Sequence, residues 1–174
     1  MKDLRNYSPR YDPTVTPINS ASSASELPTP VQSKGNGQSS FYTSADYHAL
    51  YSSGTLTPLE VAHTLLPLIR RDTNPAGEHS TAFLETHVDT VLAAAQASTE
   101  RYKSGTPLGP LDGVPVAVKD EVHLKGYKRT VGTKLDFKNG IDETSWCVKK
   151  WEEAGAVIIG KTTMHECGCG ESRT

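Results

Sequence analysis

The clearest indication of the fold is the segment Gly113-Val-Pro-Val-Ala-Val-Lys-Asp120. Its run Val114–Val118 is apolar at every position, which is typical of a strand buried on both faces of a parallel sheet. Pro115 is at odds with a central position, because proline favours strand starts, edges and bulges. Side chains alternate between the two faces, so Lys119 shares a face with Pro115 and Ala117 and lies at the carboxyl end of the strand.

A second buried strand is predicted at Val157–Ile159. A helix from about residue 144 to residue 154 precedes it, with Val148 and Trp151 on one side and Gly155 after its end. A strand, a helix and a second strand in this order are typical of a parallel β–α–β crossover. The sequence therefore predicts an α/β fold.

Upstream, residues 57–60 (Thr-Pro-Leu-Glu) are a strong helix start. Thr57 can cap the helix, Pro58 suits its first position, and Glu60 completes a capping box. The apolar helical pattern continues to Ile69, but Pro67 lies inside it. Because an interior proline costs about 3 kcal/mol, we expect a kink or an early stop there.

The other expected elements are shorter or flank this helix. Ser44 can cap a short helix that stops at Gly54. Residues 81–85 are expected to form a short strand. Apolar positions at helical spacing predict a second long helix from Val88 to Tyr102, ended by Gly105.

The first forty residues are rich in serine and proline, as in Ser20-Ala-Ser-Ser-Ala-Ser25 and Pro28-Thr-Pro30. This composition buries too little apolar surface to offset chain entropy, so residues 1–40 are predicted to be a disordered tail. Order is expected to begin near Phe41, which makes 41–174 the folded part.

Bulk properties narrow the function classes. The formal net charge of −2 and the isoelectric point of about 6.3 argue against a nucleic-acid partner or a membrane surface. No apolar run approaches the roughly 18 residues needed to cross a bilayer. Three cysteines without a disulfide-scaffold layout favour a reducing, cytoplasmic setting. A mitochondrial location stays open, although Asp3 and Asp12 are unusual in a transit segment.

A metal site is suggested by His165-Glu166 beside Cys167-Gly-Cys169. Position 169 is cysteine where the H-E-x-x-H motif needs a second histidine, and paired C-x-x-C knuckles are absent. A packing or loop role is therefore favoured, and we predict no metal and no other cofactor. Trp146 and Trp151 are expected to be packing residues rather than a substrate box.

Lys119 is the candidate catalytic residue. An α/β sheet presents functional groups at the carboxyl ends of its strands, and burial there disfavours the charged form of a lysine, which makes it a usable base. Taken alone, however, this lysine is more simply an ordinary strand-end residue that reaches solvent, with Asp120 as an available partner.

Two longer motifs change that balance. Pro107–Asp120 and Glu153–Glu166 closely resemble, in sequence, order and separation, two core segments of the amidase signature family. Residues 53–60 resemble the helix that precedes them in that family, so the resemblance covers about 44–174. It implies the first part of a large mixed sheet flanked by helices.

The resemblance also implies a chemistry. Family members hydrolyse carbon–nitrogen amide bonds of small-molecule substrates with a Ser–cis-Ser–Lys triad, in which a neutral lysine activates the nucleophilic serine through a bridging serine. Lys119 matches the lysine of that triad. Both serines lie in glycine- and serine-rich segments that are not found here, and Ser172 has no such context.

We therefore expect an N-terminal portion of an amidase signature domain that stops at Thr174, before the serine motifs, and that is inactive by itself. Two alternatives stay open. One is an amidotransferase A-subunit-like glutamine amidase. The other is a non-catalytic truncated product or pseudoenzyme. The substrate and the oligomeric state are not predicted.

Overall fold

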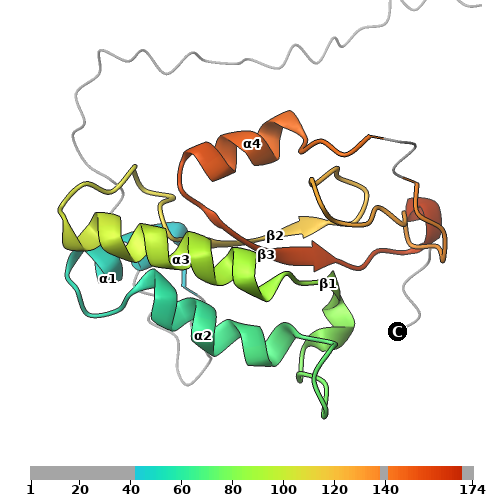
Figure 1. Cartoon of the computed structure of the whole chain (residues 1–174), viewed down its shortest axis with the longest axis horizontal. Coiled ribbons are helices and arrows are strands. Elements are labelled where there is room, and N and C mark those ends of the chain that lie inside the picture. Colours follow the sequence, from blue (N-terminus) through green and yellow to red (C-terminus); the bar gives the residue numbers. More distant parts are fainter. Residues whose placement is uncertain (1–41, 138–140, 170–174) are drawn as a thin grey trace, which may run out of the picture. The chain divides into compact units, whose positions relative to one another are not determined.

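The computed structural model describes residues 42–137 and 141–169 (Figure 1). The predicted disordered tail, 1–40, lies outside the described residues. The elements, in chain order, are α1 (Ser44–Ser52), α2 (Pro58–Ile69), the 3-10 turn η2 (Ser80–Ala82), β1 (Phe83–Glu85), α3 (Val88–Lys103), β2 (Pro115–Lys119), α4 (Trp146–Glu153), β3 (Val157–Thr162) and the 3-10 turn η3 (Glu166–Gly168).

The three strands form one mixed sheet in the order β1-β3-β2. β2 runs parallel to β3, with α4 between them in the chain, which confirms the predicted β–α–β crossover. The register pairs Val118 with Lys161 and Lys119 with Thr162. β1 runs antiparallel to β3 on its other side. The α/β fold class is therefore confirmed.

Helices cover the sheet on both faces, with α2 and α3 on one side and α4 on the other (Figure 1). Alternation along β3 explains the two cores: Val157 and Ile159 face α2 and α3, whereas Ile158 faces α4. The buried residues of the first core are Ala62, Leu66, Ile69, Phe83, Val91, Ala95, Val157 and Ile159. Those of the second core are Val118, Leu124, Tyr127, Val148 and Ile158.

Capping explains where the first two helices begin. The predicted capping box of α2 is confirmed, since the Thr57 hydroxyl accepts from the amide of Glu60 and the Glu60 carboxylate accepts from the amide of Thr57. The cap predicted for α1 is wrong by one residue: Thr43, not Ser44, caps it.

The early stop of α2 that was expected at Pro67 is also wrong, because α2 continues to Ile69. The proline falls in the last turn, where few backbone bonds depend on it.

Two strands differ from their predictions in extent, while the helix stops agree. Residues 80–82 form a 3-10 turn, so β1 begins only at Phe83. β3 extends to Thr162, three residues beyond the predicted end. The two glycines that were expected to end α1 and α3 are confirmed in that role. Both lie in the left-handed region, with a φ of 72° at Gly54 and of 70° at Gly105.

The packing role predicted for the two tryptophans is wrong within the described residues. Val148 is the buried residue of α4, and it packs against the sheet. Trp146 is 74% exposed and Trp151 is 38% exposed. Lys150 lies over the Trp146 ring, 5.8 Å from its centroid, so the outer side of this short helix carries the aromatic surface. No helix among the described residues is long and apolar enough to cross a membrane.

Candidate active site

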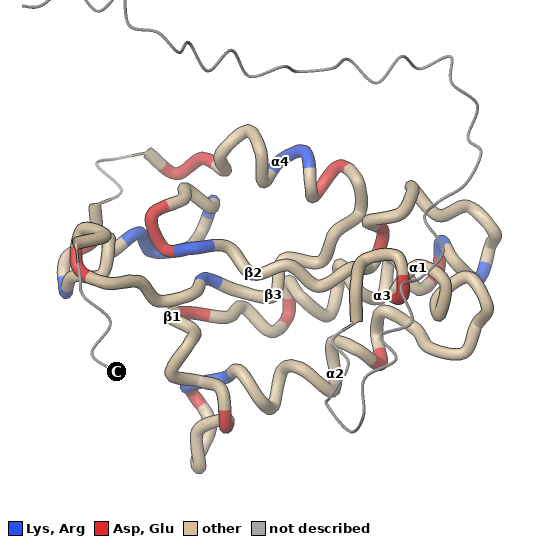
Figure 2. The backbone as a smooth tube through the Cα atoms, turned by 180° about the vertical axis from the view of Figure 1, so that it is seen from behind, with Lys and Arg blue, Asp and Glu red and all other residues tan. Residues whose placement is uncertain are grey.

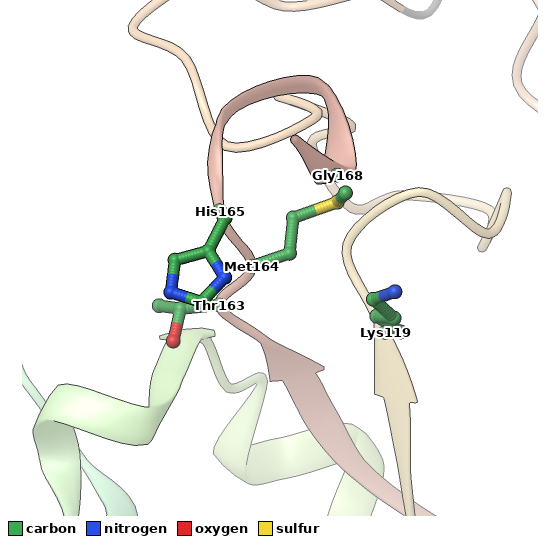
Figure 3. Close-up of a pocket in the computed structure, with 5 residues that line it drawn as sticks. All are labelled: Lys119, Thr163, Met164, His165 and Gly168. Carbon is green, nitrogen blue, oxygen red and sulfur yellow. The ribbon is translucent and has the colours of Figure 1, made fainter. Parts of the chain in front are cut away.

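An open pocket of about 470 Å³ lies at the carboxyl ends of β2 and β3. Lys119 borders it from the end of β2, and the segment that follows β3 supplies the opposite wall (Figure 3). The residues of that wall are Thr163, Met164, His165 and Gly168. The Met164 side chain extends from this wall toward the side of the pocket where Lys119 lies (Figure 3). A pocket of this size and position suits a small molecule.

Lys119 lies at the strand end, as predicted, but it is not buried. Its side chain is 53% exposed, and its ammonium group forms an ion pair with Glu121, with 2.9 Å between Nζ and Oε1. Ala117, on the same face of β2, is also exposed. The prediction that both faces of this strand are buried is therefore wrong for the described chain. Among the strands that the structure describes, β2 lies at an edge of the sheet, and only its Val118 face packs against α4.

A second lysine, Lys161 on β3, was missed by the predictions from sequence. Its side chain is fully buried, and its ammonium group donates to the backbone oxygens of Asp120, at 2.7 Å, and of Val122. Burial lowers the pKa of Lys161 below the ordinary value of a lysine, although the negative charge of Asp120 opposes that shift. The sequence contains a hint that Lys161 is buried, because this lysine directly follows the apolar run Val157–Ile159 and Gly160.

Asp120, the residue after Lys119, is also buried, with 1% exposure. Its carboxylate accepts hydrogen bonds from the Thr130 amide at 2.7 Å, the Thr130 hydroxyl at 2.6 Å and the Gly132 amide at 2.9 Å. Burial by itself would raise the pKa of Asp120, but these three donors and the nearby Lys161 lower it below its ordinary value. The predicted alternative partnership of Lys119 with Asp120 is thus replaced by a pair with Glu121.

The loop held by Asp120 packs directly on the pocket wall. A side chain at Gly132 would meet backbone atoms of His165 at 2.6 Å, so only glycine allows this approach. Val131 has a φ of 52° and Cys167 a φ of 50°, both in the left-handed region. The amide of Cys167 donates to the carbonyl oxygen of Val131 at 2.9 Å, which joins the two unusual residues.

Charged residues gather around the ends of β2 and β3 and in the loop after β2 (Figure 2). His165, Glu166 and the cysteines of the suggested metal motif lie on the loop after β3, and Glu166 and both cysteines are exposed. Within 42–137 and 141–169, no three histidine, cysteine or acidic side chains converge to hold a metal ion. Of the residues in this motif, His165 and Gly168 border the pocket.

Known proteins share this sequence and this arrangement. The sequence model of the family described as Amidase matches residues 70–173, which is more than half of the chain. The chain belongs to the amidase signature family. The matched residues include β2, α4 and β3, and they also include every residue that borders the Lys119 pocket.

Relatives in this family carry different names. The chain is 35% identical over 133 residues to the A-subunit of the glutamyl-tRNA(Gln) amidotransferase of Salinispora tropica, and the match covers 75% of this chain and 26% of the relative. It is 34% identical over 130 residues to the fatty acid amide hydrolase of Arabidopsis thaliana, and that match covers 72% of this chain and 21% of the relative. The chain thus spans about a quarter of the length of the curated relatives it matches.

Solved structures of amidases agree with the fold. A crystal structure of an amidase superposes with a TM-score of 0.61 at 30% identity, covering 72% of this chain and 27% of the amidase. The native peptide amidase from Stenotrophomonas maltophilia superposes with a TM-score of 0.60 at 26% identity, covering 71% of this chain and 25% of that chain. The described fold is therefore that of the corresponding part of amidase signature enzymes.

Proposed function

We propose that this chain contributes the lysine base and one pocket wall of an amide-bond hydrolase that acts on a small-molecule amide. The observation that carries the proposal is the position of Lys119. Within a segment matched by the amidase family, it lies at the carboxyl end of β2 and borders a pocket large enough for a small molecule. Its side chain is 53% exposed, so solvent and a reacting group can reach it although it pairs with Glu121.

The proposed step is acyl transfer to a serine. Lys119, in its neutral form, takes the proton of a bridging serine, which in turn takes the proton of the nucleophilic serine. The nucleophilic oxygen bonds to the carbonyl carbon, the carbon–nitrogen bond breaks, and the leaving amine takes up the proton. Water then releases the carboxylic acid and restores the serine. The 174 residues contain no Gly-Gly-Ser-Ser-Gly-Gly segment, so the serines of this step are not assigned to residues here.

The test measures ammonia release from glutamine, an aryl carboxamide and a fatty amide. It compares the 174-residue chain with a polypeptide that also includes any in-frame sequence downstream of Thr174. We expect turnover only where the serine-rich segments are present. Lys119→Met is expected to lower kcat by about a hundredfold or more, which is the contribution of a positioned general base.

A matched control separates the base from the charge. Lys103 is an exposed lysine in the last turn of α3 and is not among the residues that border the Lys119 pocket. Lys103→Met removes the same charge and is expected to leave kcat unchanged. Equal activity of Lys119→Met and the unsubstituted protein would reject the proposed role of Lys119. Absence of turnover in the longer polypeptide would favour the non-catalytic alternative.

The same three substrates distinguish a stand-alone amidase from an amidotransferase A-subunit-like glutamine amidase. The amidotransferase A-subunit and the fatty acid amide hydrolase match this chain with nearly equal identity, 35% and 34%. We propose a stand-alone amidase in a reducing, cytoplasmic setting, where its free and exposed cysteines stay reduced. Turnover confined to glutamine would favour the amidotransferase variant instead.

A further inference from the structure

Three buried or unusual features contact the segments that carry the Lys119 pocket, although none of them is among the residues that border it. They are the buried ammonium group of Lys161, the buried carboxylate of Asp120, and the turn at 130–132 with Val131 in the left-handed region. A β-branched residue rarely adopts a positive φ, because its side chain crowds the backbone there. Such a conformation persists only where neighbouring contacts impose it.

Asp120 supplies those contacts. Its carboxylate accepts from the amides of Thr130 and Gly132, the residues on either side of Val131. The Thr130 hydroxyl adds a third bond to the same carboxylate. The buried Asp120 carboxylate therefore binds both ends of the turn at 130–132. This leaves the backbone angles of Val131 little freedom.

Lys161 holds the anion in place. Its ammonium group donates to the carbonyl oxygens of Asp120 and Val122, so it fixes the chain just after β2. The amide of Asp120 donates to the carbonyl oxygen of Thr162 at 3.0 Å, which ties the same point to β3. The positive charge of Lys161 also compensates the buried negative charge of Asp120.

The turn at 130–132 also holds the pocket wall at 165–168. The Val131 carbonyl accepts from the Cys167 amide, and Gly132 packs against the backbone of His165. His165 and Gly168 both border the pocket, while Lys119 is the residue before Asp120. A continuous set of contacts thus connects the backbone of Lys119 with the wall that faces it.

We propose that Asp120 and Lys161 are positioning residues for Lys119: together they clamp the turn at Val131 so that the 165–168 wall is held opposite the lysine. The catalytic part of this inference rests on the proposed function. The clamp itself is a property of the 174-residue chain and can be tested without any substrate.

The first measurement is hydrogen exchange at the Cys167 amide in the full chain, followed by mass spectrometry of a peptide over residues 163–169. Asp120→Asn is expected to speed this exchange by about tenfold, as loss of one charge-assisted anchor implies. Exchange in α3 should stay unchanged. Val131→Gly, introduced into Asp120→Asn, should restore part of the protection, because glycine adopts a positive φ without a clamp.

Asp112 offers a matched control. It is also fully buried, and its carboxylate accepts bonds from Arg101, Ser98 and the Leu108 amide. Asp112→Asn therefore removes an equally buried charge that does not contact the turn, and it should leave Cys167 exchange as in the unsubstituted chain. If Asp120→Asn fails to fold, Thr130→Val removes one donor to the same carboxylate and should speed the exchange by a smaller factor.

The second measurement is amide hydrolysis by the longer polypeptide that carries the serine-rich segments. Asp120→Asn is expected to lower kcat about tenfold or more with KM within about threefold, because the wall and the base lose their alignment while the residues that border the pocket stay the same. Val131→Gly should return part of kcat when kcat is expressed per folded molecule, so that a gain in overall stability does not contribute.

The outcomes separate the two proposals. Unchanged Cys167 exchange in a folded Asp120→Asn chain would overturn the clamp. Faster exchange with an unchanged kcat would overturn the positioning role. Faster exchange in Asp120→Asn, together with no amide hydrolysis by the unsubstituted longer polypeptide, would support the clamp and reject the proposed function.

Discussion

Lys119 and Lys161 lie on neighbouring parallel strands, one register position apart, since Lys161 pairs with Val118 and Lys119 pairs with Thr162. The Lys119 side chain is 53% exposed and pairs with a surface glutamate. The Lys161 side chain is fully buried and donates to two backbone oxygens. Two residues of one type, close in space, therefore have opposite surroundings.

Burial and exposure suit the two lysines to different roles. A buried ammonium group with fixed acceptors stabilises a loop, because moving it would leave those acceptors without a partner. An exposed lysine whose partner is a half-exposed glutamate can leave that partner at little cost, so it is free to meet another group. The surroundings of Lys161 therefore fit a structural role, and those of Lys119 fit the proposed chemical role.

The largest effect is expected from Lys161→Met. The substitution keeps much of the side-chain volume but removes the donor to the Asp120 and Val122 carbonyls. Loss of a charged donor to one buried and one partly buried acceptor should lower the free energy of unfolding by about 3 kcal/mol. Lys119→Met should change it by less than about 1 kcal/mol, as for other surface pairs. Urea unfolding of both variants measures these changes. Equal losses in the free energy of unfolding would contradict a structural role that belongs to Lys161 and not to Lys119.

The second effect concerns the acid dependence of stability. The folded pKa of Asp120 is lowered, so its stabilising contribution is fully present above the ordinary carboxyl pKa of about 3.9 and is lost as the pH falls through the lowered value. Asp120→Asn should cost about 2 kcal/mol near pH 7, because its donors lose a charged acceptor. This cost should shrink as the pH falls below about 4.

Unfolding curves of Asp120→Asn and the unsubstituted chain, recorded from about pH 7 down to about pH 3, measure that difference on both sides of the ordinary carboxyl pKa of about 3.9. A constant difference at every pH would show that the charge of Asp120 is not what stabilises the turn. Asp112→Asn is the control, because it removes another buried carboxylate that does not contact the turn. The pKa of Asp112 is also lowered: burial opposes the shift, and the bonds from Arg101, Leu108 and Ser98 produce it.

The parts of the fold that local patterns determine were predictable. The apolar runs Val114–Val118 and Val157–Ile159 with a helix between them indicated the parallel crossover, and residues 57–60 indicated the start of α2. These features depend on neighbours in sequence, so the pattern itself carries the information. The position of Lys119 at a strand end was predictable for the same reason.

The burial of each lysine was not predictable from such patterns. An apolar run suggests two covered faces, but β2 is an edge strand in the described sheet, which leaves Ala117 and Lys119 exposed. The burial of Lys161 depends on a loop about forty residues earlier in the chain, which folds over its side chain. Contacts between distant segments decide both outcomes. The resemblance to a family points to Lys119 but does not describe its surroundings.

A smaller effect is expected from Val131→Gly in the otherwise unsubstituted chain. Glycine relieves the crowding of a β-branched residue at a φ of 52°, although it also adds entropy to the unfolded chain. The net result should be a gain of about 0.5–1 kcal/mol in the free energy of unfolding. Thermal and urea unfolding measure it. A loss of stability would show that Val131 contributes packing that outweighs its strain.

The smallest effect should follow from Glu121→Gln, which removes the partner of Lys119 without changing its size. Both side chains are about half exposed, at 53% and 47%, so water already solvates each charge. The free energy of unfolding should change by less than about 0.5 kcal/mol, and added salt should abolish the difference. Urea unfolding at low and high salt measures this. A loss above about 2 kcal/mol would mean that the Lys119 pair holds the end of β2, as Lys161 holds the loop after it, and that the two lysines do not divide structure and chemistry between them.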